Sequence, residues 1–159
     1  MSSWGVAGVK GIRESLEAGK GKSLHSGWVP VLARVPLFQA LSKRHLQRVA
    51  RLAELKRYSP GSQVVREGAR GDAFYIILDG GAQVQPPKGR GKELGEADYF
   101  GELALLDGAP RSATVTAIGT LTTARISRTA FLNLLKEEPA IGVGLAHGLV
   151  ALVRDLQSD

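Results

Sequence analysis

The sequence contains no cysteine. This absence excludes disulfides, zinc–thiolate centres, iron–sulfur clusters and thiol nucleophiles, and with them several classes of enzyme. Long apolar runs are also missing, because the longest, residues 141–153, is broken by His147 and is shorter than the roughly 20 residues of a membrane-spanning helix. Residues 1–22 hold no apolar core of a signal peptide. We therefore expect a cytoplasmic protein with no transmembrane segment.

Groups suited to catalysis or metal binding are scarce. The histidines, His25, His45 and His147, lie in the predicted tail and helices, whereas a cupin-like metal site would need them among the strands. No nucleophile and base occur at a recognisable spacing. Residues 19–23, GKGKS, end like a P-loop, but Leu16 occupies the position of the earlier glycine and no strand precedes the stretch. We expect no enzyme activity, no metal and no cofactor.

The remaining composition is typical of one globular domain. With 159 residues, 43% hydrophobic and 23% charged, the chain suits a single hydrophobic core. Lys and Arg number 21 against 15 Asp and Glu, and the net charge of +6 favours anionic partners without selecting among them. Residues 1–28 are basic and rich in glycine, so we predict a flexible tail there and a folded domain over 29–159. The tail is interpreted as a solvated linker, with contact to nucleic acid or anionic lipid as the alternative.

Apolar periodicity predicts helices at both ends of the folded region and strands between them. Residues 30–53 have the spacing of two short helices, the second with Ser42 as its N-cap. β-Branched and aromatic runs, separated by glycine and proline turns, then predict strands over residues 63–68, 72–80, 81–87, 112–119 and 121–127. Helical spacing returns over 127–135, and Pro139 opens a last helix whose apolar stripe reaches Leu156. We predict an α+β fold, an antiparallel, jelly-roll-like β-roll flanked by N-terminal helices and C-terminal helices.

Glycines interrupt the last predicted helix. Gly142, Gly144 and Gly148 each weaken it by about 1 kcal/mol relative to alanine. Two interpretations stay open. Either the glycines permit tight packing on the roll, or the helix orders only when a ligand arrives and thereby carries the output.

The segment YFGELALLDGAPRSATV, residues 99–115, contains the groups best suited to binding. Gly101 permits close approach of the backbone, and a helical turn beginning at Glu102 would present free N–H groups to an anion. Arg111 offers a planar fork to the same anion, and Ser112 adds a hydroxyl and an N–H. A carboxylate beside a phosphate needs donors of its own, and on a nucleotide the nearest donors are the ribose hydroxyls. We predict a phosphate-and-sugar site, with a structural Glu102–Arg111 ion pair as the alternative.

Residues 100–115, FGELALLDGAPRSATV, resemble the phosphate-binding cassette of the cyclic nucleotide-binding domain family. The resemblance extends from about Val31 to the last helix. It implies that Glu102 holds the ribose 2′-hydroxyl and Arg111 the cyclic phosphate, while N–H groups around Leu103, Ala104 and Ser112 bind the remaining phosphate oxygens. The cassette residues expected to bind ligand are Gly101, Glu102, Leu103, Ala104, Arg111, Ser112 and Ala113.

The resemblance also implies where the base lies. We expect Val84 and Leu94 beneath it and the last helix above it, where Leu149 or Arg154, or their neighbours Leu152 and Val153, would act as a lid. Ser112 either contacts the phosphate or reaches a guanine amino group, as the equivalent threonine does in relatives selective for cGMP. We favour cAMP over cGMP as the ligand.

The function implied by the resemblance is that of a sensor without catalytic activity. It would bind the nucleotide and signal to a protein effector through movement of its flanking helices. Transcription factors of this family continue into a helix-turn-helix after the last helix, and because the sequence ends at Asp159 we expect no DNA-binding domain. The alternative is a ligand-free interaction or scaffold domain that retains the fold.

Overall fold

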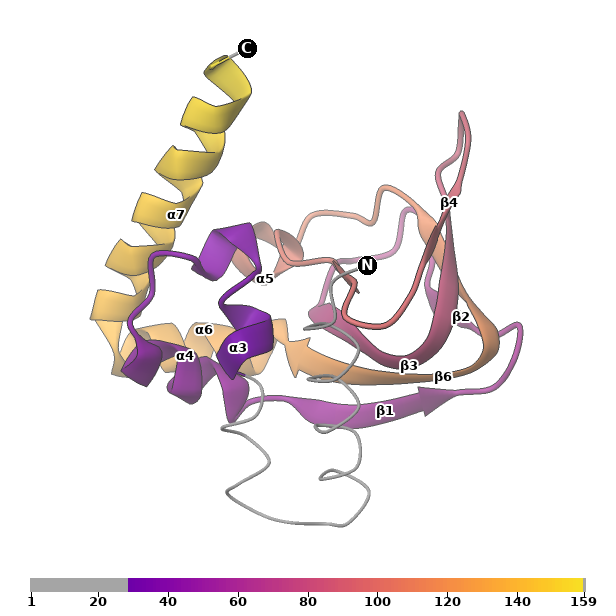
Figure 1. Cartoon of the computed structure of the whole chain (residues 1–159), viewed down its shortest axis with the longest axis horizontal. Coiled ribbons are helices and arrows are strands. Elements are labelled where there is room, and N and C mark those ends of the chain that lie inside the picture. The colour runs from indigo at the N-terminus through magenta and orange to yellow at the C-terminus, as the bar shows by residue number, and fades with distance from the viewer. Residues whose placement is uncertain (1–28, 159) are drawn as a thin grey trace.

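The computed structural model describes residues 29–158, so the predicted tail and His25 lie outside the described residues. Helices gather on one side of the molecule and strands on the other, as Figure 1 shows. The elements in chain order are α3 (Val29–Leu32), the 3-10 helix η1 (Pro36–Phe38), α4 (Lys43–Ala50), β1 (Glu54–Tyr58), β2 (Gln63–Val65), β3 (Ala73–Gln85), β4 (Lys92–Leu94), β5 (Tyr99–Phe100), α5 (Ala104–Asp107), β6 (Thr114–Ser127), α6 (Arg128–Glu137) and α7 (Pro139–Gln157).

The strands form one six-stranded sheet in which every pairing is antiparallel. The order along the main path is β1-β6-β3-β4, while β2 pairs with β6 and β5 pairs with β3. The two longest strands, β3 and β6, pair with each other from Ala73↔Ser127 to Gln85↔Thr114 and form the centre of the roll. The predicted α+β class, an antiparallel roll with helices on either side of it in sequence, is confirmed.

The prediction of turns at two glycine sites, Gly80-Gly81 and Gly119, is wrong. Strand β3 continues through Gly80 and Gly81, and β6 continues through Gly119. The register between the two strands shifts on both sides of Asp79. Gly80 has φ 83°, and a Cβ there would collide with the carbonyl oxygen of Thr120. The glycine therefore forms a bulge that bends a paired strand and does not end it.

The N-terminal helical region is more divided than predicted. The expected first helix is split into α3 and η1, because Pro36 holds the preceding Val35 in an extended conformation (ψ 119°). The predicted cap of the next helix is confirmed, since the N–H of His45 donates to Ser42 Oγ at 3.1 Å. Ser127 caps α6 in the same way, accepting from the N–H of Ala130 at 3.1 Å.

The core has two parts, and the 99–115 segment joins them. The larger cluster lies between the helices and the near ends of β3 and β6, where the ring of Phe38 meets those of Phe74 and Phe131 at centroid distances of 5.9 and 6.1 Å. The smaller cluster fills the roll around Leu121. Leu105 of α5 is buried in the first cluster and Val115 of β6 in the second. Burial at both ends holds the intervening loop in place.

Helix α7 packs on η1 through its glycines. A Cβ at Gly148 would lie 2.5 Å from the carbonyl oxygen of Leu37, and one at Gly144 would lie 2.5 Å from Leu41 Cδ2. The tight-packing interpretation of these glycines is thus supported, although their partner is the η1 region and not the roll. Beyond this contact the C-terminal half of α7 projects away from the domain (Figure 1).

Replacing Gly148 by alanine is expected to destabilise the domain by about 1–3 kcal/mol, because the added methyl group overpacks the η1 contact. Gly142→Ala provides the matched control: its Cβ meets nothing within 4 Å, so the higher helix propensity of alanine should stabilise the protein by about 0.5–1 kcal/mol. Urea unfolding of both variants measures the difference. Equal stabilisation by the two substitutions would contradict the docking of α7 on η1.

Helix α7 is also long and apolar enough, by length and composition, to cross a membrane. The helix has 19 residues, and an 18-residue segment of it has a mean hydropathy of 1.3, with 17% of that segment buried within the structure. The sequence-based prediction considered only residues 141–153, whereas the helix extends further at both ends. A single helix of this kind is weak evidence for a membrane span, because core helices of soluble proteins meet the same criterion.

Candidate functional site

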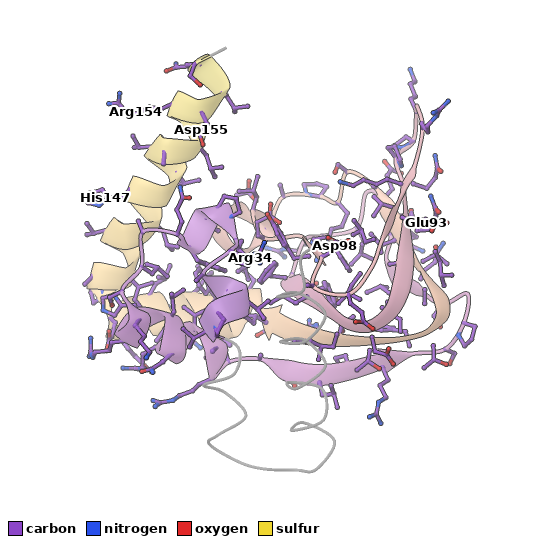
Figure 2. All side chains as sticks on the ribbon, viewed as in Figure 1. Arg34, Glu93, Asp98, His147, Arg154 and Asp155 are labelled. Atoms are coloured by element: carbon purple, nitrogen blue, oxygen red, sulfur yellow. The ribbon has the colours of Figure 1, made fainter. Side chains whose placement is uncertain are left out.

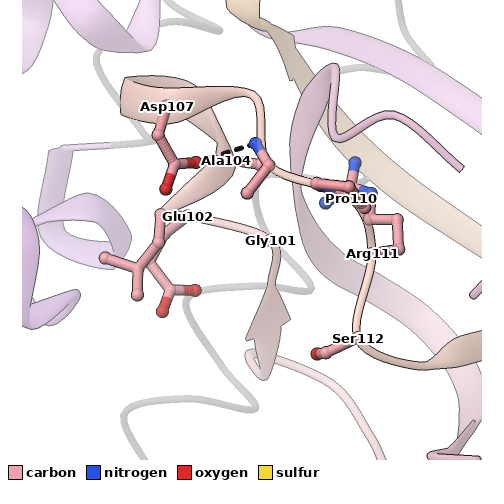
Figure 3. Close-up of a pocket in the computed structure, with 9 residues that line it drawn as sticks. Gly101, Glu102, Ala104, Asp107, Pro110, Arg111 and Ser112 are labelled. Atoms are coloured by element: carbon pink, nitrogen blue, oxygen red, sulfur yellow. Dashed lines mark hydrogen bonds between the residues drawn. The ribbon is translucent and has the colours of Figure 1, made fainter. Parts of the chain in front are cut away.

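A pocket of about 330 Å³ lies along the loop that connects β5 to β6. Its lining residues are Gly101, Glu102, Leu103, Ala104, Asp107, Ala109, Pro110, Arg111 and Ser112. Every predicted cassette residue except Ala113 therefore lines one pocket. Figure 3 shows Glu102 and Arg111 on opposite sides of it. The loop is held internally as well, since the N–H of Ala109 donates to Asp107 Oδ1 at 2.9 Å.

Arg111 is a buried cation at this pocket, with 8% of its surface exposed. Its Nη2 donates to the carbonyl oxygen of Ala73 at 2.7 Å and lies 3.7 Å from Asp72 Oδ1. Its guanidinium carbon lies 6.0 Å from the centre of the Tyr75 ring. Nε is buried and has no hydrogen-bond partner among the described residues. Burial lowers the pKa of Arg111, a shift that Tyr75 and Asp72 oppose, and the guanidinium remains charged at neutral pH.

Asp72 and Tyr75 orient this arginine, and sequence reasoning did not find either. The carboxylate of Asp72 lies between two arginines, with Oδ1 facing Arg111 and Oδ2 lying 3.7 Å from Nη2 of Arg125. Nε of Arg125 in turn donates to the hydroxyl of Tyr75 at 3.4 Å. In the sequence, Asp72 stands out only as an acidic residue next to a strongly apolar strand. Its arginine partners lie about 40 to 50 positions away, so sequence spacing does not connect them.

Glu102 faces the pocket without pairing to Arg111. Within residues 29–158 its side chain forms no hydrogen bond and no ion pair, while its backbone carbonyl oxygen accepts from the N–H of Leu105 at 3.2 Å. The alternative of a structural Glu102–Arg111 ion pair is therefore wrong for this structure, because the guanidinium turns towards Ala73 and Asp72. The pocket keeps a half-buried carboxylate whose acceptor oxygens are available to donors from outside the protein.

Backbone N–H groups remain available at the pocket, among them those of two predicted phosphate-binding residues. Those of Leu103 and Ser112 have no partner in the part of the chain that the structure describes. The N–H of Ala104 differs from the prediction, because it donates to the carbonyl oxygen of Gly101 at 3.2 Å. Helix α5 begins at Ala104, and Leu103 is its N-cap. The exposed Ser112 hydroxyl adds a further donor at the rim.

A second hollow, of about 500 Å³, adjoins the first at Glu102. Its lining residues are Val84, Lys92, Leu94, Asp98, Tyr99, Phe100 and Glu102. The structure thus brings the predicted base-contact residues, Val84 and Leu94, next to the cassette. Burial, followed by the nearby carboxylates of Glu102 and Asp98, raises the pKa of Tyr99. The first hollow therefore presents a buried cation to an anion, and the second, beside it, has a lining of both polar and apolar side chains.

Helix α7 contributes three of the four predicted lid residues to a groove beside this site and leaves Arg154 outside it. Leu149, Leu152 and Val153 line an apolar groove of about 440 Å³ that also includes Leu103 of the cassette. Arg154 is exposed and lies on the side of α7 that faces away from the domain (Figure 2). Within the described residues, no group of three or more metal-binding side chains occurs.

Comparison with known proteins identifies the family. The model of the cyclic nucleotide-binding domain matches residues 55–138, which is more than half of the chain. The chain therefore belongs to the cyclic nucleotide-binding domain family, and the resemblance of residues 100–115 to its cassette is confirmed at the level of the family.

Similar proteins include regulatory subunits and a transcriptional regulator. The chain is 44% identical over 113 residues to a cAMP-dependent protein kinase regulatory subunit of Mycosarcoma maydis, with 65% of this chain and 22% of that protein covered. The corresponding subunit of Aspergillus fumigatus is 39% identical over 106 residues, with 65% and 26% covered. The chain thus spans about a quarter of the length of these relatives. Among solved structures, the N-terminal domain of a transcriptional regulator from Streptomyces coelicolor is similar with a TM-score of 0.68 and 27% identity, covering 79% of this chain and 94% of that one.

Proposed function

We propose that this protein binds a cyclic nucleotide, cAMP in preference to cGMP, and acts as a regulatory module without catalytic activity. The observation that carries the proposal is the buried guanidinium of Arg111, whose Nε has no partner and which lines the pocket opposite the unpaired Glu102. A buried cation with unused donors gains most from an anionic ligand, because charge-assisted hydrogen bonds offset its desolvation. The names of the regulatory subunits similar to this chain support cAMP as the ligand.

The proposal assigns each part of the nucleotide to a part of the site. Arg111 and the N–H groups of Leu103 and Ser112 would bind the cyclic phosphate, and the unpaired carboxylate of Glu102 would accept from the ribose 2′-hydroxyl. The base would occupy the adjoining hollow against Val84 and Leu94. Gly101 would leave room beside the phosphate, and Ala113 would hold the end of the cassette at the entry to β6.

Output is proposed to pass through α7 to a protein effector. Leu149 of α7 and Leu103 of the phosphate pocket line the same groove. A shift of the cassette when nucleotide binds would therefore change the packing of α7 against it. Hydrogen exchange over residues 139–157, with and without cAMP, tests this step. Nucleotide should increase protection there, and equal protection in both states would contradict a role of α7 in output.

Isothermal titration of the purified chain with cAMP and, separately, cGMP tests the binding itself. Absorbance must first show that no nucleotide has co-purified. One site per chain, with tighter binding of cAMP, is the expected result. Folded, nucleotide-free protein that gives no heat with either ligand would replace the proposal by the alternative of an interaction domain that has lost its ligand.

The role of Glu102 is separable from that of the phosphate contacts. Glu102→Gln is expected to weaken cAMP binding by about 10- to 100-fold, since a hydrogen bond to a charged group contributes about 1.5–3 kcal/mol. Titration with 2′-deoxy-cAMP should show little further loss in this variant, because that ligand lacks the hydroxyl. Asp107→Asn removes a carboxylate from the same pocket and should leave the affinity for cAMP nearly unchanged or slightly higher. If Glu102→Gln weakened the binding of cAMP and of 2′-deoxy-cAMP equally, the carboxylate would not contact the 2′-hydroxyl.

A further inference from the structure

A lysine occupies the inner face of the β3–β4 hairpin, where an apolar residue would be expected. In the antiparallel pairing Lys92 lies opposite Val84, and Leu94 lies opposite Ala82. Because side chains alternate along a strand, Lys92 and Leu94 share one face, and Glu93 points to the other. This face is the inner one, since Ala82 is fully buried in the roll and Val84 and Leu94 pack against the same cluster. Lys92 and Leu94 both line the second hollow, and Glu93 does not.

The ammonium group of Lys92 is free to meet a ligand. It forms no hydrogen bond and no ion pair with any residue between 29 and 158. Of the two acids that line the hollow, Asp98 accepts through its Oδ2 from the N–H of Gly95 at 2.8 Å. Glu102 lines the same hollow without forming an ion pair with the lysine. The hollow therefore presents a cation on its strand side and a carboxylate on its cassette side, unpaired with each other.

We propose that Lys92 is a specificity-determining residue that contacts the edge of the purine, a role that rests on the proposed function of the site. An ammonium group donates hydrogen bonds and accepts none. Guanine offers two acceptors on one edge, N7 and O6, whereas adenine offers the acceptor N7 beside an amino donor. Lys92 accordingly raises the affinity for cGMP and limits the preference of the site for cAMP. Cyclic IMP carries the same O6 and N7 acceptors without the guanine amino group, so Lys92 donates hydrogen bonds to it in the same way.

Titration of Lys92→Met with cGMP, cIMP and cAMP tests the inference. Affinity for cGMP and cIMP is expected to fall by about 5- to 10-fold, while affinity for cAMP stays within about twofold, because only the first two carry the O6 acceptor, and at adenine an amino donor stands in its place beside N7. Lys92→Arg retains the donors and should keep most of the binding of cGMP and cIMP. Lys88→Met is the matched control, since it removes the same charge from the exposed tip of the same hairpin and should leave the affinities for all three nucleotides unchanged.

Two outcomes would overturn the inference alone. Equal loss for the three nucleotides in Lys92→Met would mean that the ammonium group attracts the phosphate at long range, and unchanged affinities would mean that it does not touch the base. Loss of cGMP binding without loss of cIMP binding would also count against it, because the two bases differ only in the guanine amino group, a donor that an ammonium group cannot accept from. Folded wild-type protein that binds none of the three would instead refute the proposed function itself.

Discussion

Arg111→Ala should abolish measurable cyclic nucleotide binding while leaving the domain folded. Truncating one partner of a buried, hydrogen-bonded charge pair weakens binding by about 2–5 kcal/mol, which corresponds to about 30-fold to 5,000-fold in affinity. The cost in stability is expected to be smaller. Asp72 is largely exposed and keeps Arg125 as a partner, so removing Arg111 chiefly deprives the Ala73 carbonyl of one donor. That loss is expected to lower the free energy of unfolding by about 1 kcal/mol.

The comparison that makes this result specific uses two further variants. Arg111→Lys keeps the charge but lacks the planar fork, so affinity should still fall by at least about 10-fold. Arg66→Ala removes an exposed arginine outside the pocket and should bind as the wild type does. Titration calorimetry gives the affinities and thermal unfolding gives the stability. If Arg111→Ala unfolds at ordinary temperature, the arginine has a structural role and the assignment to phosphate loses its main support.

Gly101→Ala is expected to reduce both binding and stability. Gly101 has φ 84°, a left-handed conformation in which an L side chain is strained by about 1–2 kcal/mol. The added Cβ would also lie 2.5 Å from Nη1 of Arg111 and 2.9 Å from the carbonyl oxygen of Ala73. The methyl group must therefore displace the guanidinium from its site. Misaligning these charge-assisted donors should weaken cAMP binding on the order of 100-fold.

A matched glycine isolates the effect of the steric contact. Gly61 has nearly the same φ, 81°, but a Cβ there would meet nothing within 4 Å. Gly61→Ala should therefore show the same backbone strain in urea unfolding and bind cAMP with wild-type affinity. Comparable binding by the two alanine variants would show that Arg111 need not occupy its present position for the ligand to bind.

The components of the phosphate pocket could be predicted from the sequence because they lie close together along the chain. Gly101 to Ser112 spans a single loop, so spacing alone brings a carboxylate, a guanidinium and a hydroxyl to one place. The N-cap Ser42 could be predicted for the same reason, since a cap acts only on the turn that follows it. The effect of Pro36 is also local but was not predicted. It holds Val35 in an extended conformation and so divides a helix that apolar spacing alone predicted as continuous.

Contacts between distant segments could not be predicted in this way. Whether Gly80 is a turn or a bulge depends on the presence of a partner strand, and β6 supplies that partner more than 30 residues later. The orientation of Arg111 depends on Asp72 and Ala73, which lie just before and at the start of β3, about 40 residues earlier in the chain. Lys92 reaches the second hollow only through its register opposite Val84.

The sequence by itself therefore determined the chemistry of the loop, the class of the fold and the family to which it belongs, because these depend on local spacing and on the polarity pattern along the chain. Only the tertiary structure decided which groups stay unpaired. The side chains of Glu102 and Lys92 and Nε of Arg111 form no hydrogen bond within residues 29–158, and the fold places all three at the two adjoining hollows. Hydrogen-bond satisfaction is a property of the packed molecule, and it is what makes this pocket a candidate for an anionic ligand.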